Sequence, residues 1–183
     1  MFRFLIILIA VFFSAITSAQ SSYQVDIILF AHPTGSATRT ELDLNAPLIP
    51  VSQKAIPLTK SRGRSNTAYT ILPSSQSGLQ NEYYLLSHKP GYKIIGHYSW
   101  RQPANNQSSI ALPESNQNGW TVQGTIRIKQ SNFYSLDTDL YLSPSDDPQS
   151  SLNIAQKQRI KGGMVYYLDN PLIGMLIKAH KVS

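Results

Sequence analysis

The sequence contains no cysteine. That absence excludes a disulfide framework, a thiolate metal site, a cysteine nucleophile and an acylated-cysteine lipoprotein anchor. Any stability of the fold must therefore come from packing and hydrogen bonding, and nothing covalent of this kind ties the chain to a membrane.

Residues for catalysis and metal binding are also scarce. The chain has four histidines, and none has a second histidine or a carboxylate at metal-ligand spacing. Gly-x-Ser-x-Gly, His-Glu-x-x-His and phosphate-binding glycine loops are missing. Asp137 and Asp139 stand two apart, as an acid and base pair could, but a polar strand edge explains them better. We therefore predict a protein that is not an enzyme and has no metal or other cofactor.

Only one long apolar run is present, and it lies at the N-terminus. Arg3 precedes the run from Phe4 to Phe13, and small residues follow as far as Ala19. The run is shorter than the roughly 20 apolar residues of a membrane-spanning helix. This layout predicts a cleavable signal peptide over residues 1–19 and a single periplasmic domain over residues 20–183.

The chain is basic. Without Arg3, 15 of the 16 Lys and Arg residues remain against 10 Asp and Glu residues, which gives the exported chain a net charge of +5. A basic surface favours anionic partners. Export makes nucleic acid an improbable partner, which leaves muropeptide carboxylates, lipid phosphates or an acidic protein surface.

The apolar pattern predicts mostly strands. Residues 23–31 are apolar on both faces, which is typical of a buried central strand. Further strands are expected at 92–100, in a hairpin over 120–142, at 152–160 running on to 168, and at 172–179. Residues 32–65 are predicted to be a proline-rich loop excursion. Its basic end (Lys60, Arg62 and Arg64) is a weak candidate for anion contact, and a solvated charge run is the favoured alternative.

One helix is expected between the first two long strands. Ser74 and Ser75 favour a helix start, Leu79, Tyr83 and Leu86 share one helical face, and Pro90-Gly91 ends the helix. We therefore predict an α+β, mainly β fold: an antiparallel sheet of about six strands with one packed helix.

Two clusters are candidates for ligand binding. In the first, an aromatic ring, a guanidinium and an amide stand together at Trp100, Arg101 and Gln102, a combination able to stack on a sugar and hold a carboxylate. Alternation favours core packing for Trp100 and exposure for Arg101 and Gln102.

The second cluster is Tyr166, Tyr167 and Asp169, which lie next to a turn. A turn stabilised by the Asp169 and Asn170 side chains is the favoured alternative to ligand binding there.

Several blocks of the sequence occur in an order that resembles one known family. They are residues 23–30 (YQVDIILF), 69–73 (YTILP), 91–103 (GYKIIGHYSWRQP), 124–128 (GTIRI), 139–142 (DLYL) and 159–174 (RIKGGMVYYLDNPLIG). Together they resemble the CsiV family of periplasmic peptidoglycan-binding proteins. The resemblance implies a periplasmic protein that binds peptidoglycan and supports a cell-wall synthase through an activator lipoprotein of the outer membrane.

The sequence departs from that family pattern at several polar positions. Met164 stands where the family typically has Glu, Tyr166 and Asn170 where it has His, and Ile173 where it has Phe. These departures and the long loop motivate an alternative hypothesis, in which the protein is a structural subunit of an envelope-spanning assembly such as a secretion system.

Overall fold

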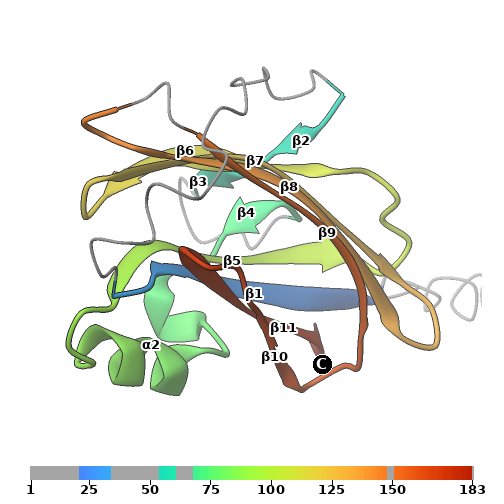
Figure 1. Cartoon of the computed structure of the whole chain (residues 1–183). Coiled ribbons are helices and arrows are strands. Elements are labelled where there is room, and N and C mark those ends of the chain that lie inside the picture. The colour runs from blue at the N-terminus through green and yellow to red at the C-terminus, as the bar shows by residue number, and fades with distance from the viewer. Residues whose placement is uncertain (1–20, 34–53, 61–67, 148–150, 183) are drawn as a thin grey trace, which may run out of the picture.

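The computed structural model of the chain describes residues 21–33, 54–60, 68–147 and 151–182. In this part of the chain the fold is a sandwich of two β-sheets with one α-helix on its outside (Figure 1). The predicted signal peptide and most of the 32–65 excursion, including Arg62 and Arg64, lie outside the described residues.

The first sheet has six strands. In spatial order they are β10 (Val165–Leu168), β11 (Ile173–Val182), β1 (Ser22–Ala31), β5 (Lys93–Pro103), β4 (Thr70–Ile71) and β3 (Thr59–Lys60). All pairs are antiparallel except the short β3–β4 pair.

Strand β1 is central in this sheet and is buried on both faces, as its sequence predicts. Val25, Ile27 and Leu29 point into the core between the two sheets. On the outer face, Ile28 and Phe30 join a second, smaller apolar cluster. Two buried faces explain why the strand has no regular alternation of polar and apolar residues.

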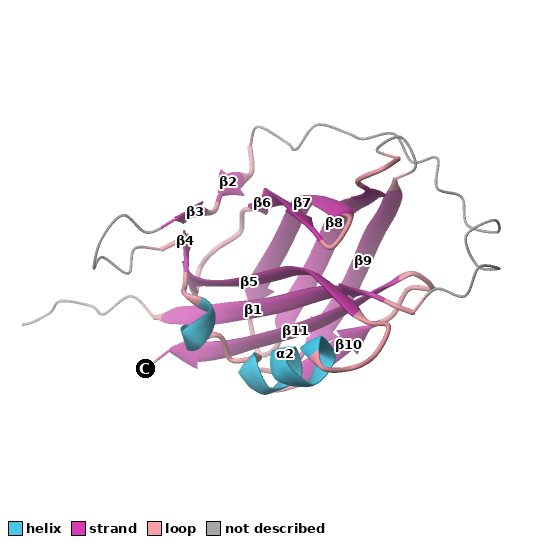
Figure 2. Cartoon of the chain, turned by 90° about the vertical axis from the view of Figure 1, so that its left-hand side faces the viewer, coloured by secondary structure: helices cyan, strands magenta, loops and turns pink. Residues whose placement is uncertain are grey.

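The helix α2 (Gln80–Ser87) covers the outer face of the first sheet (Figure 2). Leu79, fully buried, and Leu86 pack onto the outer cluster, so the predicted helix on one sheet face is confirmed. The helix begins later than its Ser74-Ser75 signal suggests, since these residues form a separate 3₁₀ turn, η1 (Ser74–Gln76). Among the described residues, no helix is long and apolar enough to cross a bilayer.

The second sheet has five strands: β2 (Ile56–Pro57), β6 (Ile110–Gln117), β7 (Trp120–Gln130), β8 (Tyr134–Pro144) and β9 (Leu152–Ile160). Its centre is the β7–β8 hairpin, which matches the predicted hairpin over 120–142. The expectation of one sheet with about six strands is wrong, because the chain divides into two sheets that bury a shared core. Strand β6 escapes the sequence pattern because only its first half is apolar, at Ile110 and Leu112.

Two further strand predictions are corrected by the structure. The expected continuous strand from 152 to 168 is two strands in different sheets, since the Gly162-Gly163 turn carries the chain from β9 in the second sheet to β10 in the first. In β5, a register shift opposite Leu29 and Phe30 breaks the alternation. Ile94 therefore faces the outer cluster, whereas Trp100 faces the core.

Candidate functional site

Trp100 and Gln102, two residues of the first candidate cluster, lie inside the sandwich and are fully buried. Trp100 Nε1 donates to Gln102 Oε1 at 2.8 Å, and Gln102 Nε2 donates to the Ile128 carbonyl at 3.1 Å and to the Tyr23 hydroxyl. The expected exposure of Gln102 is therefore wrong, because its amide joins the polar groups of two packed sheets. In this structure neither side chain offers a surface to a ligand.

Arg101 points the other way, to the outer face of the first sheet, where it lies opposite Gln24. Nearby on this face, the fully buried Asp26 accepts hydrogen bonds at Oδ1 from Gln24 (2.9 Å) and Ser99 (2.7 Å). Asp26 Oδ2 lies 3.6 Å from His180 Nδ1. Alternation thus separates the three neighbours that the sequence grouped together, and Arg101 belongs to a polar layer on the opposite side of the sheet from Trp100.

This polar layer predicts a pH dependence of stability. His97, opposite Ile28, lies on the same outer face. Burial lowers the pKa of His97 and of His180, although the nearby Asp26 opposes this in both. Such a histidine takes up a proton more readily in the unfolded chain than in the folded one. Stability is therefore complete above the ordinary histidine pKa of about 6.5 and is lost as the pH falls below it.

Denaturant unfolding at pH 7.5 and pH 5.5 measures this dependence. We expect a lower free energy of unfolding at pH 5.5, and a smaller difference between the two pH values for His97→Asn. A wild-type protein that is equally stable at both pH values contradicts the assignment.

The second candidate cluster is divided between two faces of the edge strand β10. Tyr166 points inward and packs against the core, and its hydroxyl accepts a hydrogen bond from the Lys161 amide at 2.9 Å. Tyr167 points outward and is 50% exposed. Val165, also exposed, shares the outer face with Tyr167. The structure therefore keeps Tyr167 and Asp169 together and separates Tyr166 from them.

Tyr167 is an exposed aromatic member of a group of outward-facing side chains, which we call the tyrosine platform: Phe30, His32, Tyr92, Tyr167 and Asp169. The Tyr167 ring stacks on Phe30, with ring centroids 6.1 Å apart and planes at 13°. His32 packs edge-on against Phe30 and Tyr92. The platform therefore brings together the ends of β1 and β10 and the start of β5.

Polar contacts fix the orientation of the Tyr167 ring. Its hydroxyl donates to Asp169 Oδ1 at 2.5 Å, and His32 Nε2 lies 3.1 Å from the same oxygen. The hydrogen bond from Tyr167, together with the contact with His32, lowers the pKa of Asp169. Burial and the Asp169 carboxylate raise the pKa of Tyr167. At neutral pH the platform therefore presents a neutral phenol and an ionised carboxylate.

Gly174 makes this packing possible. A Cβ at this position would overlap the Phe30 ring and would lie 2.9 Å from the Tyr167 ring. Because Gly174 has no side chain, the two rings can stack above this position of β11.

An exposed aromatic ring next to a carboxylate and an imidazole suits a polar ligand with flat apolar faces, such as a sugar. The ring face provides apolar contact, and the polar groups beside it provide hydrogen bonds. Within the described ranges, no group of three His, Asp or Glu residues is arranged to hold a metal ion. Asp137 pairs with Arg127, and Asp139 accepts from Asn153 at 2.9 Å, so each carboxylate has its own partner.

His32 and Tyr92 belong to the platform, although the sequence did not single them out. His32 follows the last residue of β1, and Tyr92 directly precedes β5. No motif connects them to Tyr167, since only strand order brings these positions together. Of the basic segment, Lys60 pairs through its backbone with Ile71, and Arg62 and Arg64 lie outside the described residues.

The fold and the platform define a class: a β-sandwich with an exposed aromatic surface suited to binding. The chain belongs to the CsiV family, described as peptidoglycan-binding proteins, because the family model matches residues 1–182. No curated protein and no solved structure matched the chain.

Proposed function

We propose that this protein binds peptidoglycan in the periplasm without catalysis, and that the tyrosine platform holds the glycan strand. The observation that supports this assignment is the half-exposed Tyr167 ring, held in place by Phe30 and Asp169. Membership of a peptidoglycan-binding family supports the choice of ligand.

The amino sugars of peptidoglycan match the chemistry of the platform. Their rings have apolar faces that can pack on an aromatic plane, and their acetamido and hydroxyl groups can bond to Asp169 and His32. Because Tyr167 is already held in one orientation, little side-chain entropy is lost on binding.

Residues 1–19 act in this proposal as a cleavable signal peptide, so that the chain from Gln20 onward works in the periplasm. N-terminal sequencing of the protein purified from cells is expected to begin at Gln20. A chain that retains Met1 would contradict this part of the proposal.

Co-sedimentation with purified sacculi tests the binding itself. At low salt the protein is expected to pellet with sacculi and to remain in solution without them. Hydrolysis of the sacculi with a muramidase provides the control, since it removes the pelletable ligand. A protein that stays in the supernatant with intact sacculi contradicts the proposed function.

Support of wall synthesis would require a protein partner as well, and we place a synthase activator in that role. The observation that favours a protein contact is the outward face of α2, where Tyr84 and Leu85 are 62% and 68% exposed. Exposed aromatic and aliphatic side chains close together are typical of protein contacts.

The same surface keeps the alternative function open, a structural subunit of an envelope-spanning assembly. Affinity purification from gently solubilised envelopes separates the two. Co-purification of a wall synthase or its activator supports the first, and a stable multi-subunit complex without them supports the second. A Leu85→Ser variant is expected to lose either partner while still pelleting with sacculi.

A further inference from the structure

A groove lies at the other end of the first sheet from the tyrosine platform. It is a groove of about 560 Å³ between the β7–β8 turn, the Gly162-Gly163 turn and the end of β11. Phe133, His180 and Lys181 are among the side chains that line it. A groove of this volume is within the range of small-ligand sites.

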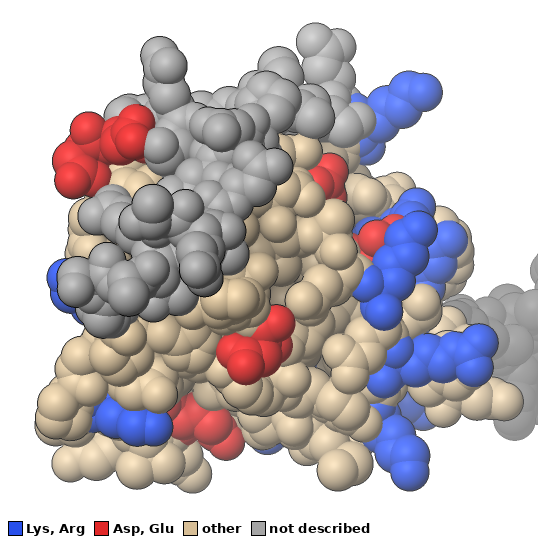
Figure 3. Space-filling model, in the orientation of Figure 1, with Lys and Arg blue, Asp and Glu red and all other residues tan. Residues whose placement is uncertain are grey.

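The exposed charge in the groove lining is basic. Among the described residues no Asp or Glu lines the groove, and the Asp26 carboxylate, 3.6 Å from Nδ1 of the lining residue His180, is fully buried. Lys181 is exposed in its lining, and Arg159 lies over the Phe133 ring, 4.5 Å from its centroid. Lys129, near the end of β7, and Lys161, just after β9, add two further positive charges at the same end of these strands. Figure 3 shows Lys and Arg gathered on this side of the molecule.

The Gly162-Gly163 turn forms one side of the groove and has no side chains that would fill it. At Gly163, which has a φ of +80°, a Cβ would meet no atom within 4 Å. At Gly162, a Cβ would lie 2.9 Å from the Tyr134 ring, so the turn packs close to that ring only because it lacks side chains. The result is an open groove with Phe133 on one side and the Lys181 and Arg159 side chains at its edge.

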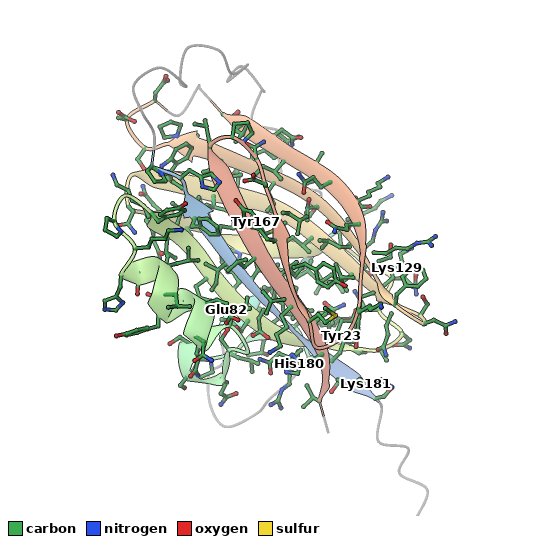
Figure 4. All side chains as sticks on the ribbon, turned by 60° about the horizontal axis from the view of Figure 1, so that its bottom comes forward. Tyr23, Glu82, Lys129, Tyr167, His180 and Lys181 are labelled. Carbon is green, nitrogen blue, oxygen red and sulfur yellow. The ribbon has the colours of Figure 1, made fainter. Side chains whose placement is uncertain are left out.

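The groove and the platform are connected by strand β11. Tyr167 lies opposite Leu176, and Lys181 is five residues further along the strand. At the rise of an antiparallel strand this separation is about 17 Å, and Figure 4 shows the two labelled residues well apart. Lys181 pairs with the core-facing Tyr23, so it lies on the opposite face of the sheet from Tyr167, and this distance is the separation along the strand alone.

We propose that this groove binds the free carboxylates of a peptidoglycan stem peptide. The inference rests on the proposed function, since the stem peptide belongs to the same wall polymer as the glycan on the platform. Lys181 and Arg159 pair with the carboxylates, and the Phe133 ring contacts the small apolar side chains of the stem. The positive charge of Lys181 and Arg159 explains why an anionic peptide is favoured over the glycan itself at this end.

Titration calorimetry with a synthetic, sugar-free stem peptide tests the proposal. The wild-type protein is expected to bind the peptide at low salt. It is not expected to bind a form of the peptide in which every carboxylate is amidated. Lys181→Gln and Arg159→Gln are each expected to weaken binding about fivefold, as for a partly exposed ion pair. Lys157→Gln is the matched control, because it removes the same charge from an exposed position of β9 that lies opposite Asp137, whereas Arg159 lies over the lining residue Phe133.

Equal binding of the amidated peptide, or equal weakening by Lys157→Gln, overturns the proposal, because the effect would then not depend on carboxylates in this groove. The result is separable from the proposed function. If the protein pellets with sacculi but does not bind the peptide, the proposed peptide site in the groove is wrong and the proposed function stands. A protein that binds the peptide but does not pellet contradicts the proposed function and leaves the groove as a peptide site.

Discussion

Replacing Tyr167 by alanine is expected to weaken binding to purified sacculi about tenfold, equivalent to about 1.4 kcal/mol. The substitution removes the exposed ring of the platform, and with it the apolar surface that a sugar ring would cover. Tyr167 is an exposed side chain on an edge strand, so we expect little loss of stability. Co-sedimentation at several protein concentrations gives the apparent Kd of each variant.

Two further variants make this result specific. Tyr167→Phe keeps the ring but loses the hydrogen bond to Asp169, and is expected to weaken binding only severalfold. Tyr84→Ala removes a tyrosine from α2 that is more exposed than Tyr167 and is expected to leave sacculus binding unchanged. If Tyr167→Ala binds as tightly as the wild type, the platform is not the glycan site.

Gln102→Ala is expected to lower the free energy of unfolding by about 3 kcal/mol, without loss of sacculus binding in the folded protein. The substitution removes the acceptor of the buried Trp100 Nε1 and a donor to the Ile128 carbonyl. It also leaves a cavity between the sheets. Leaving a buried polar group without a partner destabilises a core by about 1 kcal/mol or more, and so does leaving a cavity.

Denaturant unfolding measures this effect, and Gln158→Ala at an exposed position of β9 is the control with the same chemical change. The control is expected to be as stable as the wild type. A Gln102→Ala protein that unfolds like the wild type but no longer pellets with sacculi would instead indicate that Gln102 takes part in ligand binding.

Local patterns in the sequence predicted the elements that are regular along the chain. The apolar residues on both faces of 23–31 predicted the central strand β1, and alternation over 120–142 predicted the hairpin of β7 and β8. Both patterns depend only on neighbouring residues, which is why they can be read without knowledge of the fold. The helix at Gln80–Ser87 was predicted for the same reason.

The division into two sheets was not predictable in this way. Strands 152–160 and 165–168 read as one segment, because nothing in the local pattern indicates that the Gly162-Gly163 turn changes sheets. The β5 bulge likewise depends on pairing with β1. Both features are set by contacts between distant parts of the chain.

The same limit explains which site residues were found. Tyr167 and Asp169 were identified because they are neighbours in sequence, but strand alternation separates Tyr166 from them. His32 and Tyr92 were missed because β1 and β5 bring them to Tyr167 only in the folded protein. Gln102 was misplaced because its buried polar partners lie on β1 and on the other sheet.

The most direct test of the glycan site is an amide chemical-shift titration of the ¹⁵N-labelled protein with soluble, muramidase-released wall fragments. The largest shifts are expected at His32, Tyr92, Tyr167 and Asp169, with no response at Trp100 and Gln102. A titration that leaves these four amides unchanged, while the fragments bind elsewhere or not at all, contradicts the assignment of the tyrosine platform.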